Sequence, residues 1–197
     1  MSGGTVASLV NVIKESSNNP ALRKLMQNPY AVAPHGQRKG VRQPNVRGAS
    51  FDKDFQQWLA PFIMAAINTR VVHRSNALHD YAWGEEFLYD EATLMGKGAA
   101  GRFRAYGLVA GLGVFMSFAA VSASRKILER FVLPAPGEGP TPEEQEKGCY
   151  DLRFLATTPE GKELRTKVTG DKDPGYGSTA KMLAEAAICM ARETPKS

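Results

Sequence analysis

A long apolar stretch at residues 107–124 limits how this chain can fold, because such a segment must be buried in protein or placed against lipid. It is slightly shorter than the roughly 20 residues that a bilayer-spanning helix needs. Three arrangements remain open: a buried pair of core helices, a surface lying in a membrane interface or on a lipid droplet, and a membrane span. The flanking cations favour contact with anionic headgroups: Arg102, Arg104, Arg125, Lys126 and Arg130.

The 197 residues correspond to about one domain, and their net charge of +5 is unevenly distributed. Between Glu15 and Asp52 every charged side chain is positive: Arg23, Lys24, Arg38, Lys39, Arg42 and Arg47. Such a basic segment can contact phosphates, an anionic membrane or an acidic partner, or it can simply be a solvated loop. No aromatic residue lies between Tyr30 and Phe51 to stack on bases, which argues against nucleic-acid recognition.

The cysteine and histidine positions indicate no metal site. Cys149 and Cys189 are far apart, and His73 and His79 fall on different faces of a helix. The N-terminus has no positively charged segment followed by an apolar core, as a secretory signal would have. We therefore expect an intracellular, cytoplasmic protein without disulfides.

Hydrophobic periodicity predicts several helices. Residues 5–15 form one, and Asn19 and Pro20 begin a second over residues 20–28; each has one narrow apolar stripe that needs a cover. Residues 33–50 read as a linker, and residues 51–78 return to a helical pattern that Pro61 starts or kinks.

The last third predicts a hairpin between two helices. Thr141, Pro142 and Glu144 form a capping box that begins the first helix. Residues 150–155 and 164–168 alternate as antiparallel strands with one wet face, joined by a turn at residues 158–161, and residues 86–91 also alternate as a strand. The final helix, residues 178–192, has a stripe that we expect to be buried: Met182, Leu183, Ala186, Cys189 and Met190.

These elements predict an α+β fold with an antiparallel or mixed sheet and helices packed on one face. We divide it into residues 1–50, two helices and the basic linker, and residues 51–197, an α+β domain that contains the apolar segment.

Two groups of residues are candidates for binding a substrate or an anion. On the helix over residues 51–78, polar groups between apolar turns either bind something or belong to a buried network: Asn68, Arg70, Arg74 and Ser75. In DPGYGSTAKM a helix begins whose free amides would stabilise an anion, although an ordinary capped loop fits as well: Tyr176, Gly177, Ser178 and Lys181. No nucleophile and base stand at recognisable spacing, so no catalytic residue is assigned.

A dinucleotide fingerprint is not recognisable. The closest runs, Gly96–Gly101 and Gly107–Gly113, lack a preceding Val/Ile-rich strand and an acidic residue about twenty positions further on. We expect no cofactor to be bound by this chain alone.

Several motifs occur in a recognisable order: SGGT at residues 2–5, NPALRKLMQNPYAVAP at 19–34, APFIMAAINTRVVHRSNAL at 60–78, FLYDE at 87–91, PGEGP at 136–140 and DPGYGSTAKM at 173–182. Together they resemble the second half of the saccharopine dehydrogenase-like oxidoreductases. This group is similar to the bacterial trans-acting enoyl reductases of complex-lipid synthesis and to a eukaryotic protein associated with lipid droplets and membranes.

The resemblance implies a preceding Rossmann domain that carries the NAD(P) site, whereas SGGT here follows the initiator methionine. It predicts a truncated gene model, a split gene or an isolated C-terminal domain. The expected function is the substrate half of an NAD(P)-dependent reductase of lipid-like acyl groups, inactive alone, with a separate Rossmann domain as partner and a homodimer as a further possibility. The alternative is a non-catalytic module that binds a membrane or lipid droplet.

Overall fold

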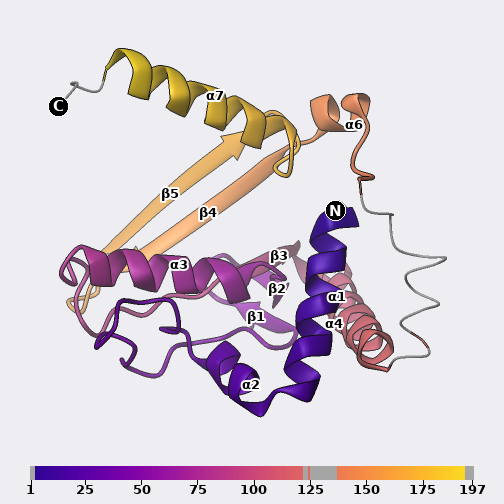
Figure 1. The fold of residues 1–197 in the computed structure, drawn as a ribbon, viewed down its shortest axis with the longest axis horizontal. Coiled ribbons are helices and arrows are strands. Elements are labelled where there is room, and N and C mark those ends of the chain that lie inside the picture. The colour runs from indigo at the N-terminus through magenta and orange to yellow at the C-terminus, as the bar shows by residue number, and fades with distance from the viewer. Residues whose placement is uncertain (1–2, 122–123, 125–136, 194–197) are drawn as a thin grey trace. The chain divides into compact units, whose positions relative to one another are not determined.

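The computed structural model describes residues 3–121, 124 and 137–193. The chain divides into two compact units: a larger one, Val10–Leu128, and a smaller one, Met1–Leu9 with Glu129–Ser197 (Figure 1). These bounds differ from those of the two predicted domains, because residues 10–50 group with the segment that follows them. The packing of residues 1–50 on a further domain remains a prediction.

Two helices begin the chain, α1 at Gly3–Asn18 and α2 at Pro20–Gln27. The predicted start of α2 is confirmed: Asn19 is the N-cap, and its side-chain oxygen accepts from the Leu22 amide at 3.1 Å. On α2, Leu25 and Met26 are exposed, so this helix leaves its apolar stripe uncovered.

The larger unit holds a three-stranded antiparallel sheet with the order β1-β2-β3, made of Ser50–Asp52, Gln57–Pro61 and Ala92–Gly96. The helix predicted from residue 51 is therefore wrong for residues 51–61. The Asp52 carboxylate accepts from the Asp54 and Phe55 amides at 3.0 and 2.7 Å and so closes a tight turn between β1 and β2. The apolar residues in this segment have a helical periodicity, but the contact of the Asp52 side chain with the backbone favours a hairpin.

Helix α3, Ala65–Leu78, begins soon after Pro61. The strand predicted at residues 86–91 is wrong, because the pairing strand begins only at Ala92. The backbone before Ala92 bonds instead to the side chain of Gln43, which accepts from the Tyr89 amide and donates to the Phe87 carbonyl oxygen.

Helix α4, Gly98–Ala120, packs on β2 and β3. Trp58 of β2 lies 6.0 Å from the Tyr106 ring, and Arg102 stacks over both rings. Only small residues of α4 are buried, namely Gly101, Ala105 and Ala119. A buried pair of core helices is therefore wrong for residues 107–120, since this is one helix with most of its surface exposed.

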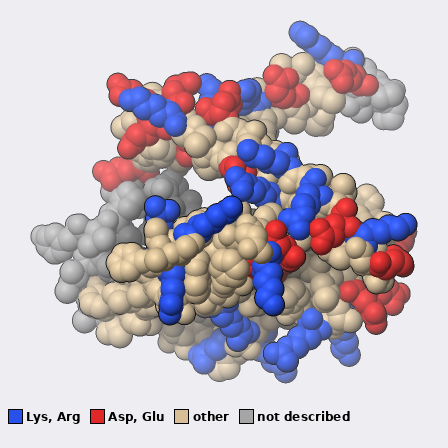
Figure 2. Space-filling view, turned by 180° about the vertical axis from the view of Figure 1, so that it is seen from behind, with Lys and Arg blue, Asp and Glu red and all other residues tan. Residues whose placement is uncertain are grey.

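Helix α4 is long and apolar enough to cross a membrane, by length and composition alone. Figure 2 shows a broad uncharged surface at the place of α4, at the lower left of that view. The other two arrangements of this segment, an interfacial helix and a membrane span, remain predictions.

The smaller unit contains α6, Pro142–Lys147, the hairpin β4–β5, Tyr150–Thr157 with Glu163–Gly170, and α7, Gly177–Arg192. The predicted capping box is confirmed, with Thr141 and Glu144 bonded reciprocally. The predicted hairpin is confirmed too, and Gly161 has the positive φ of 79° that its turn needs.

The burial predicted for α7 is wrong. Leu183 and Met190 are 70% and 73% exposed, and Met182, Ala186 and Cys189 are exposed as well. On the hairpin, Leu152 pairs with Val168, and both are exposed. Within the described residues the smaller unit thus has regular elements whose apolar faces lack a cover. The molecule combines helices with small antiparallel sheets, as predicted, and a Rossmann-related half fold remains a prediction.

Candidate functional site

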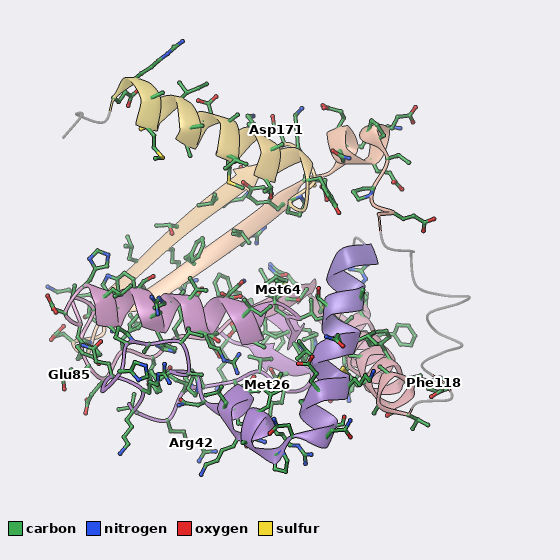
Figure 3. All side chains as sticks on the ribbon, viewed as in Figure 1. Met26, Arg42, Met64, Glu85, Phe118 and Asp171 are labelled. Carbon is green, nitrogen blue, oxygen red and sulfur yellow. The ribbon has the colours of Figure 1, made fainter. Side chains whose placement is uncertain are left out.

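A cavity of about 820 Å³ lies within the larger unit, between four segments that are distant in sequence. Residues 26–30 are the end of α2 and the turn after it, and residues 38–47 belong to the basic segment. Pro61 to Arg70 lead from β2 into α3, and Tyr89 to Glu91 precede β3. Figure 3 marks Met26 and Arg42, which come from the first two of these segments. We call this space the basic cavity.

Gln43 joins three walls of the basic cavity. Its side-chain nitrogen donates to the Tyr30 hydroxyl at 2.6 Å and to the Phe87 carbonyl oxygen at 3.0 Å. Its side-chain oxygen accepts from the Tyr89 amide at 3.1 Å. Sequence reasoning missed Gln43, because no spacing pattern links it to partners 44 and 46 residues further along the chain.

Tyr30 and Asn28 hold the backbone of the basic segment in place. Its hydroxyl donates to the Val41 carbonyl oxygen at 2.8 Å, while Asn28 donates to the Arg38 carbonyl oxygen at 3.1 Å. Gly40 lies flat on the Tyr30 ring, where an added Cβ would stand 2.5 Å from a ring carbon. The linker expected at residues 33–50 is therefore irregular but tightly held.

A carboxylate is positioned at the opposite wall. Glu91 accepts from the Asn68 side-chain amide and from the Tyr89 hydroxyl, both at 2.9 Å. Burial, and next the hydrogen bond to Glu91, raise the pKa of Tyr89 to about 12. Tyr89 therefore stays protonated near neutral pH and acts as a hydrogen-bond donor.

An aromatic cluster holds His73 behind this wall. The His73 ring lies 4.9 Å from the ring of Tyr30 and 6.2 Å from that of Phe87, and only 3% of the residue is exposed. Its Nε2 has no hydrogen-bond partner among the described residues, and burial lowers the pKa of His73. His73 is therefore a neutral packing residue of this cluster.

The structure separates the candidates on α3. Asn68 belongs to the Glu91 network, and Arg70 lines the basic cavity. Arg70 and Arg74 also donate to the carbonyl oxygens of Met26 and Val32, which ties α3 to the end of α2 and to the segment after it. Ser75 donates to the Val71 carbonyl oxygen of its own helix at 3.0 Å. Arg74 and Ser75 thus make structural contacts here.

The DPGYGSTAKM candidates lie in the smaller unit. The amides of Tyr176 and Gly177 donate to the Asp173 carboxylate at 2.6 and 3.3 Å, and Ser178 is buried with its hydroxyl bonded to the Lys172 carbonyl oxygen. These bonds satisfy amides that the sequence left free for a ligand. Lys181 pairs with Asp171 at 3.3 Å, so the chain supplies its own carboxylates at this helix start.

The run GKGAAG, set aside above for lack of a strand, does follow one: β3 ends at Gly96 and α4 begins at Gly98. Gly96 and Gly98 have φ of 97° and 62°, and an added Cβ at Gly101 would lie 2.1 Å from the Gly96 carbonyl oxygen. However, β3 is antiparallel to β2, whereas a dinucleotide fold uses parallel strands. The strand, turn and helix seen here therefore do not fit an NAD(P) site of the Rossmann type.

The lining of the basic cavity includes cations, two carboxylates, amides and two tyrosines, but among the described residues it includes no Ser, Cys or His. Within the same residues no group of three or more His, Cys, Asp or Glu side chains is placed to hold a metal ion. The charged and polar side chains that line this cavity, next to an apolar wall, support ligand binding.

Comparison with known proteins adds the relationship. No protein-family model and no solved structure matches the chain. A Mycobacterium tuberculosis protein, for which the activity of a trans-acting enoyl reductase is itself a proposal, is 34% identical over 99% of this chain and 48% of its own length. The protein named trans-acting enoyl reductase in Mycobacterium bovis is 33% identical over 97% of this chain and 47% of its own length. Its namesake in Mycobacterium ulcerans is 29% identical over 96% and 47%.

The chain thus spans about half the length of the curated relatives it matches. The predicted relation to these proteins is confirmed, while the wider saccharopine dehydrogenase-like family remains a prediction. Over nearly its whole length, the chain is homologous to part of the proteins named trans-acting enoyl reductase.

Proposed function

We propose that this chain is the substrate-binding half of an NAD(P)-dependent reductase that acts on enoyl or acyl groups of lipids. The observation that carries the proposal is the similarity of 33–34% over nearly the whole chain to proteins named trans-acting enoyl reductase. The basic cavity supports it, because about 820 Å³ is within the usual range of a small-molecule site.

The lining of the basic cavity suits an acyl group with a polar end. Pro61, Phe62, Ala65 and Ala66 offer an apolar wall where β2 leads into α3. Tyr89 and Glu91, hydrogen-bonded to each other, make another wall polar. A thioester bound here would lay its chain on the first wall and its polar end along the second.

The nicotinamide cofactor belongs, in this proposal, to a separate domain or chain. The turn between β3 and α4 does not fit a Rossmann site, as described above, so no step of the reaction is assigned to residues of this chain. We expect the chain to bind the acyl substrate and to need a cofactor-binding partner for reduction.

The test is calorimetric titration with a medium-chain enoyl thioester of N-acetylcysteamine, which carries no phosphate. We expect saturable binding that Ala66→Phe abolishes, because the new ring would occupy the apolar wall on which the acyl chain is expected to lie. Ala110→Phe, on the exposed part of α4 and outside the cavity lining, is the matched control and should bind normally. Binding that survives Ala66→Phe, or no binding at all, would contradict the proposal.

A second candidate, a membrane-associated module, is favoured by the exposed face of α4. Phe103, Val114 and Phe118 lie on one helical stripe and are 81%, 60% and 50% exposed. Figure 3 marks Phe118 near the end of this helix. No Asp or Glu occurs between Glu91 and Glu129, whereas five cations flank the uncharged residues 105–124: Lys97, Arg102, Arg104, Arg125 and Lys126. This pattern suits an anionic lipid surface.

Flotation with vesicles that contain an anionic phospholipid tests this candidate. We expect co-flotation that is lost when Phe103, Val114 and Phe118 are all changed to Ser. The control changes Leu183 and Met190 to Ser; both are exposed, at 70% and 73%, but they lie on α7, where the acidic Glu185 accompanies the cations Lys181 and Arg192. Equal loss of co-flotation with both sets of changes would show non-specific hydrophobic adsorption and reject the candidate.

A further inference from the structure

Within the part of the chain that the structure describes, the cations of the basic cavity have no acidic partner. Residues 38–47 contribute Arg38, Lys39, Arg42 and Arg47, and α3 contributes Arg70. Among the residues that the structure describes, no ion pair joins any of these five to a carboxylate; the ion pairs found all lie between Glu143 and Lys181. A cavity wall with unneutralised positive charge attracts an anion.

The backbone that presents these cations is held in advance of binding. Hydrogen bonds from Asn28 and Tyr30 fix the carbonyl groups of Arg38 and Val41, and Gln43 is bonded on both sides of its amide. The side chains of Lys39, Arg42 and Arg47 make no hydrogen bond with the rest of the described chain, and they are exposed. Ordering costs on binding are then limited to these side chains.

Arg70 is the least exposed of the five cations. It is half-buried, donates to the Met26 carbonyl oxygen, and has a pKa lowered by burial. A guanidinium carries five N–H donors, so most of its donors remain for a ligand. A bound anion would offset the cost of burying this charge.

Two carboxylates also line the cavity, Asp90 and Glu91, and among the described residues neither forms an ion pair with these cations. Glu91 accepts from Asn68 and Tyr89. The pKa of Asp90 is raised by burial and then by the charges of Asp52 and Glu91, because nearby negative charges disfavour its ionised form. Five cations therefore face two carboxylates, and the excess positive charge lies on residues 38–47.

We propose that the basic segment and Arg70 form a binding site for a phosphate ester, so that the ligand of the basic cavity carries a phosphate or pyrophosphate group. Arginine suits this role because its planar guanidinium donates two parallel hydrogen bonds to phosphate oxygens. The inference extends the proposed function, since it places the anionic end of the ligand beside the wall assigned to the acyl group, and it can fail independently of it.

Titration with inorganic pyrophosphate at low ionic strength tests the site. We expect saturable binding that weakens at least about tenfold in the double variant Arg42→Gln, Arg47→Gln, because each lost guanidinium removes charge-assisted hydrogen bonds. The control, Lys14→Gln with Lys53→Gln, removes the same charge from the larger unit outside the cavity lining. Equal weakening in both double variants would reduce the effect to net charge and overturn the site, as would no binding.

Two ligands then separate the sources of the phosphate. 4′-Phosphopantetheine represents the phosphate of an acyl-carrier arm, and 2′-phospho-ADP-ribose represents that of a dinucleotide. The site holds if either binds more tightly than pyrophosphate and depends on Arg42 and Arg47. If the phosphate-free enoyl thioester binds while pyrophosphate does not, the phosphate site fails and the proposed function stands. If pyrophosphate binds while the thioester does not, the phosphate site stands and the proposed function fails.

Discussion

The two units use their charged side chains in opposite ways. In the smaller unit, Arg153 and Lys167 both pair with Asp151, and Lys172 and Lys181 pair with Glu146 and Asp171. In the larger unit, the cations of the basic cavity have no acidic partner among the described residues. Charge that pairs internally serves the local fold, and charge held on a rigid backbone without a partner is available to a ligand.

The units also differ in how they hold their elements together. The larger unit joins distant segments through part-buried side chains such as Gln43 and Tyr30. The smaller unit relies on one hairpin and on exposed contacts between α6 and the segment after β5, such as the Lys172–Glu146 pair, and its apolar faces stay exposed. Substitutions in the larger unit should therefore have larger effects, and both tryptophans, Trp58 and Trp83, lie there to report them.

The largest effect is expected at Gly101. In Gly101→Ala the new methyl group would lie 2.1 Å from the Gly96 carbonyl oxygen, so α4 must shift from β3. We expect a loss of about 3 kcal/mol in the free energy of unfolding, the upper range for over-packing. The measurement is urea unfolding followed by tryptophan fluorescence.

Gly107→Ala is the matched control on the same helix, because nothing lies within 4 Å of the added Cβ. This change should stabilise the unit by up to about 1 kcal/mol, the difference in helix propensity. Similar urea midpoints for the two variants would show that α4 is not docked on β3 as described.

Gln43→Ala should come next, with a loss of about 2 kcal/mol, because it leaves the Tyr89 amide and the Phe87 carbonyl oxygen without their partner. It should also abolish thioester binding, since the walls of the basic cavity lose their link. Gln57→Ala is the control: this side chain, on β2, makes no hydrogen bond within the described residues. Normal thioester binding by Gln43→Ala would show that the cavity does not depend on side-chain links between distant segments. The contrast drawn between the two units would then be lost.

A smaller effect is expected from pH through His73. The unfolded chain protonates this imidazole near 6.5, while burial lowers its pKa in the folded state. Stability of the larger unit should therefore be greatest above the unfolded pKa and fall as the pH drops through it, by about 1.4 kcal/mol for each unit of pKa difference.

Urea unfolding between about pH 8 and about pH 5 measures this dependence apart from the titration of most carboxylates. In His73→Gln the slope attributable to His73 should disappear, because no group at this position then changes charge. A slope that persists unchanged would assign the pH dependence to other groups.

The smallest effect is expected in the smaller unit. Arg153, and next Lys167, hold the pKa of Asp151 below its ordinary value of 3.8, so the contribution of Asp151 is present above that pH and is lost as the pH falls below it. Because these pairs are exposed, Asp151→Asn should leave amide hydrogen exchange of β4 and β5 unchanged near neutral pH. Faster exchange throughout the hairpin would mean that surface ion pairs carry its stability.

Part of the fold was predictable because its signals are local. The capping box at Thr141, the cap at Asn19 and the turn at residues 158–161 each depend on side chains within a few residues, and all were confirmed. The strands at residues 50–61 and the absence of a strand at 86–91 were not predictable in this way. In both places a side chain, Asp52 or Gln43, satisfies backbone groups that periodicity assigns to regular structure.

The sequence by itself determined the capped starts of α2 and α6, the hairpin of the smaller unit, the excess of cations before Asp52 and the relation to trans-acting enoyl reductases. Only the tertiary structure decided that the basic segment closes a cavity with α3 and Glu91, that α4 buries only small residues, and that α7 leaves its stripe exposed. The physical reason is that caps and turns depend on neighbours in sequence, whereas burial and charge pairing depend on which distant surfaces meet.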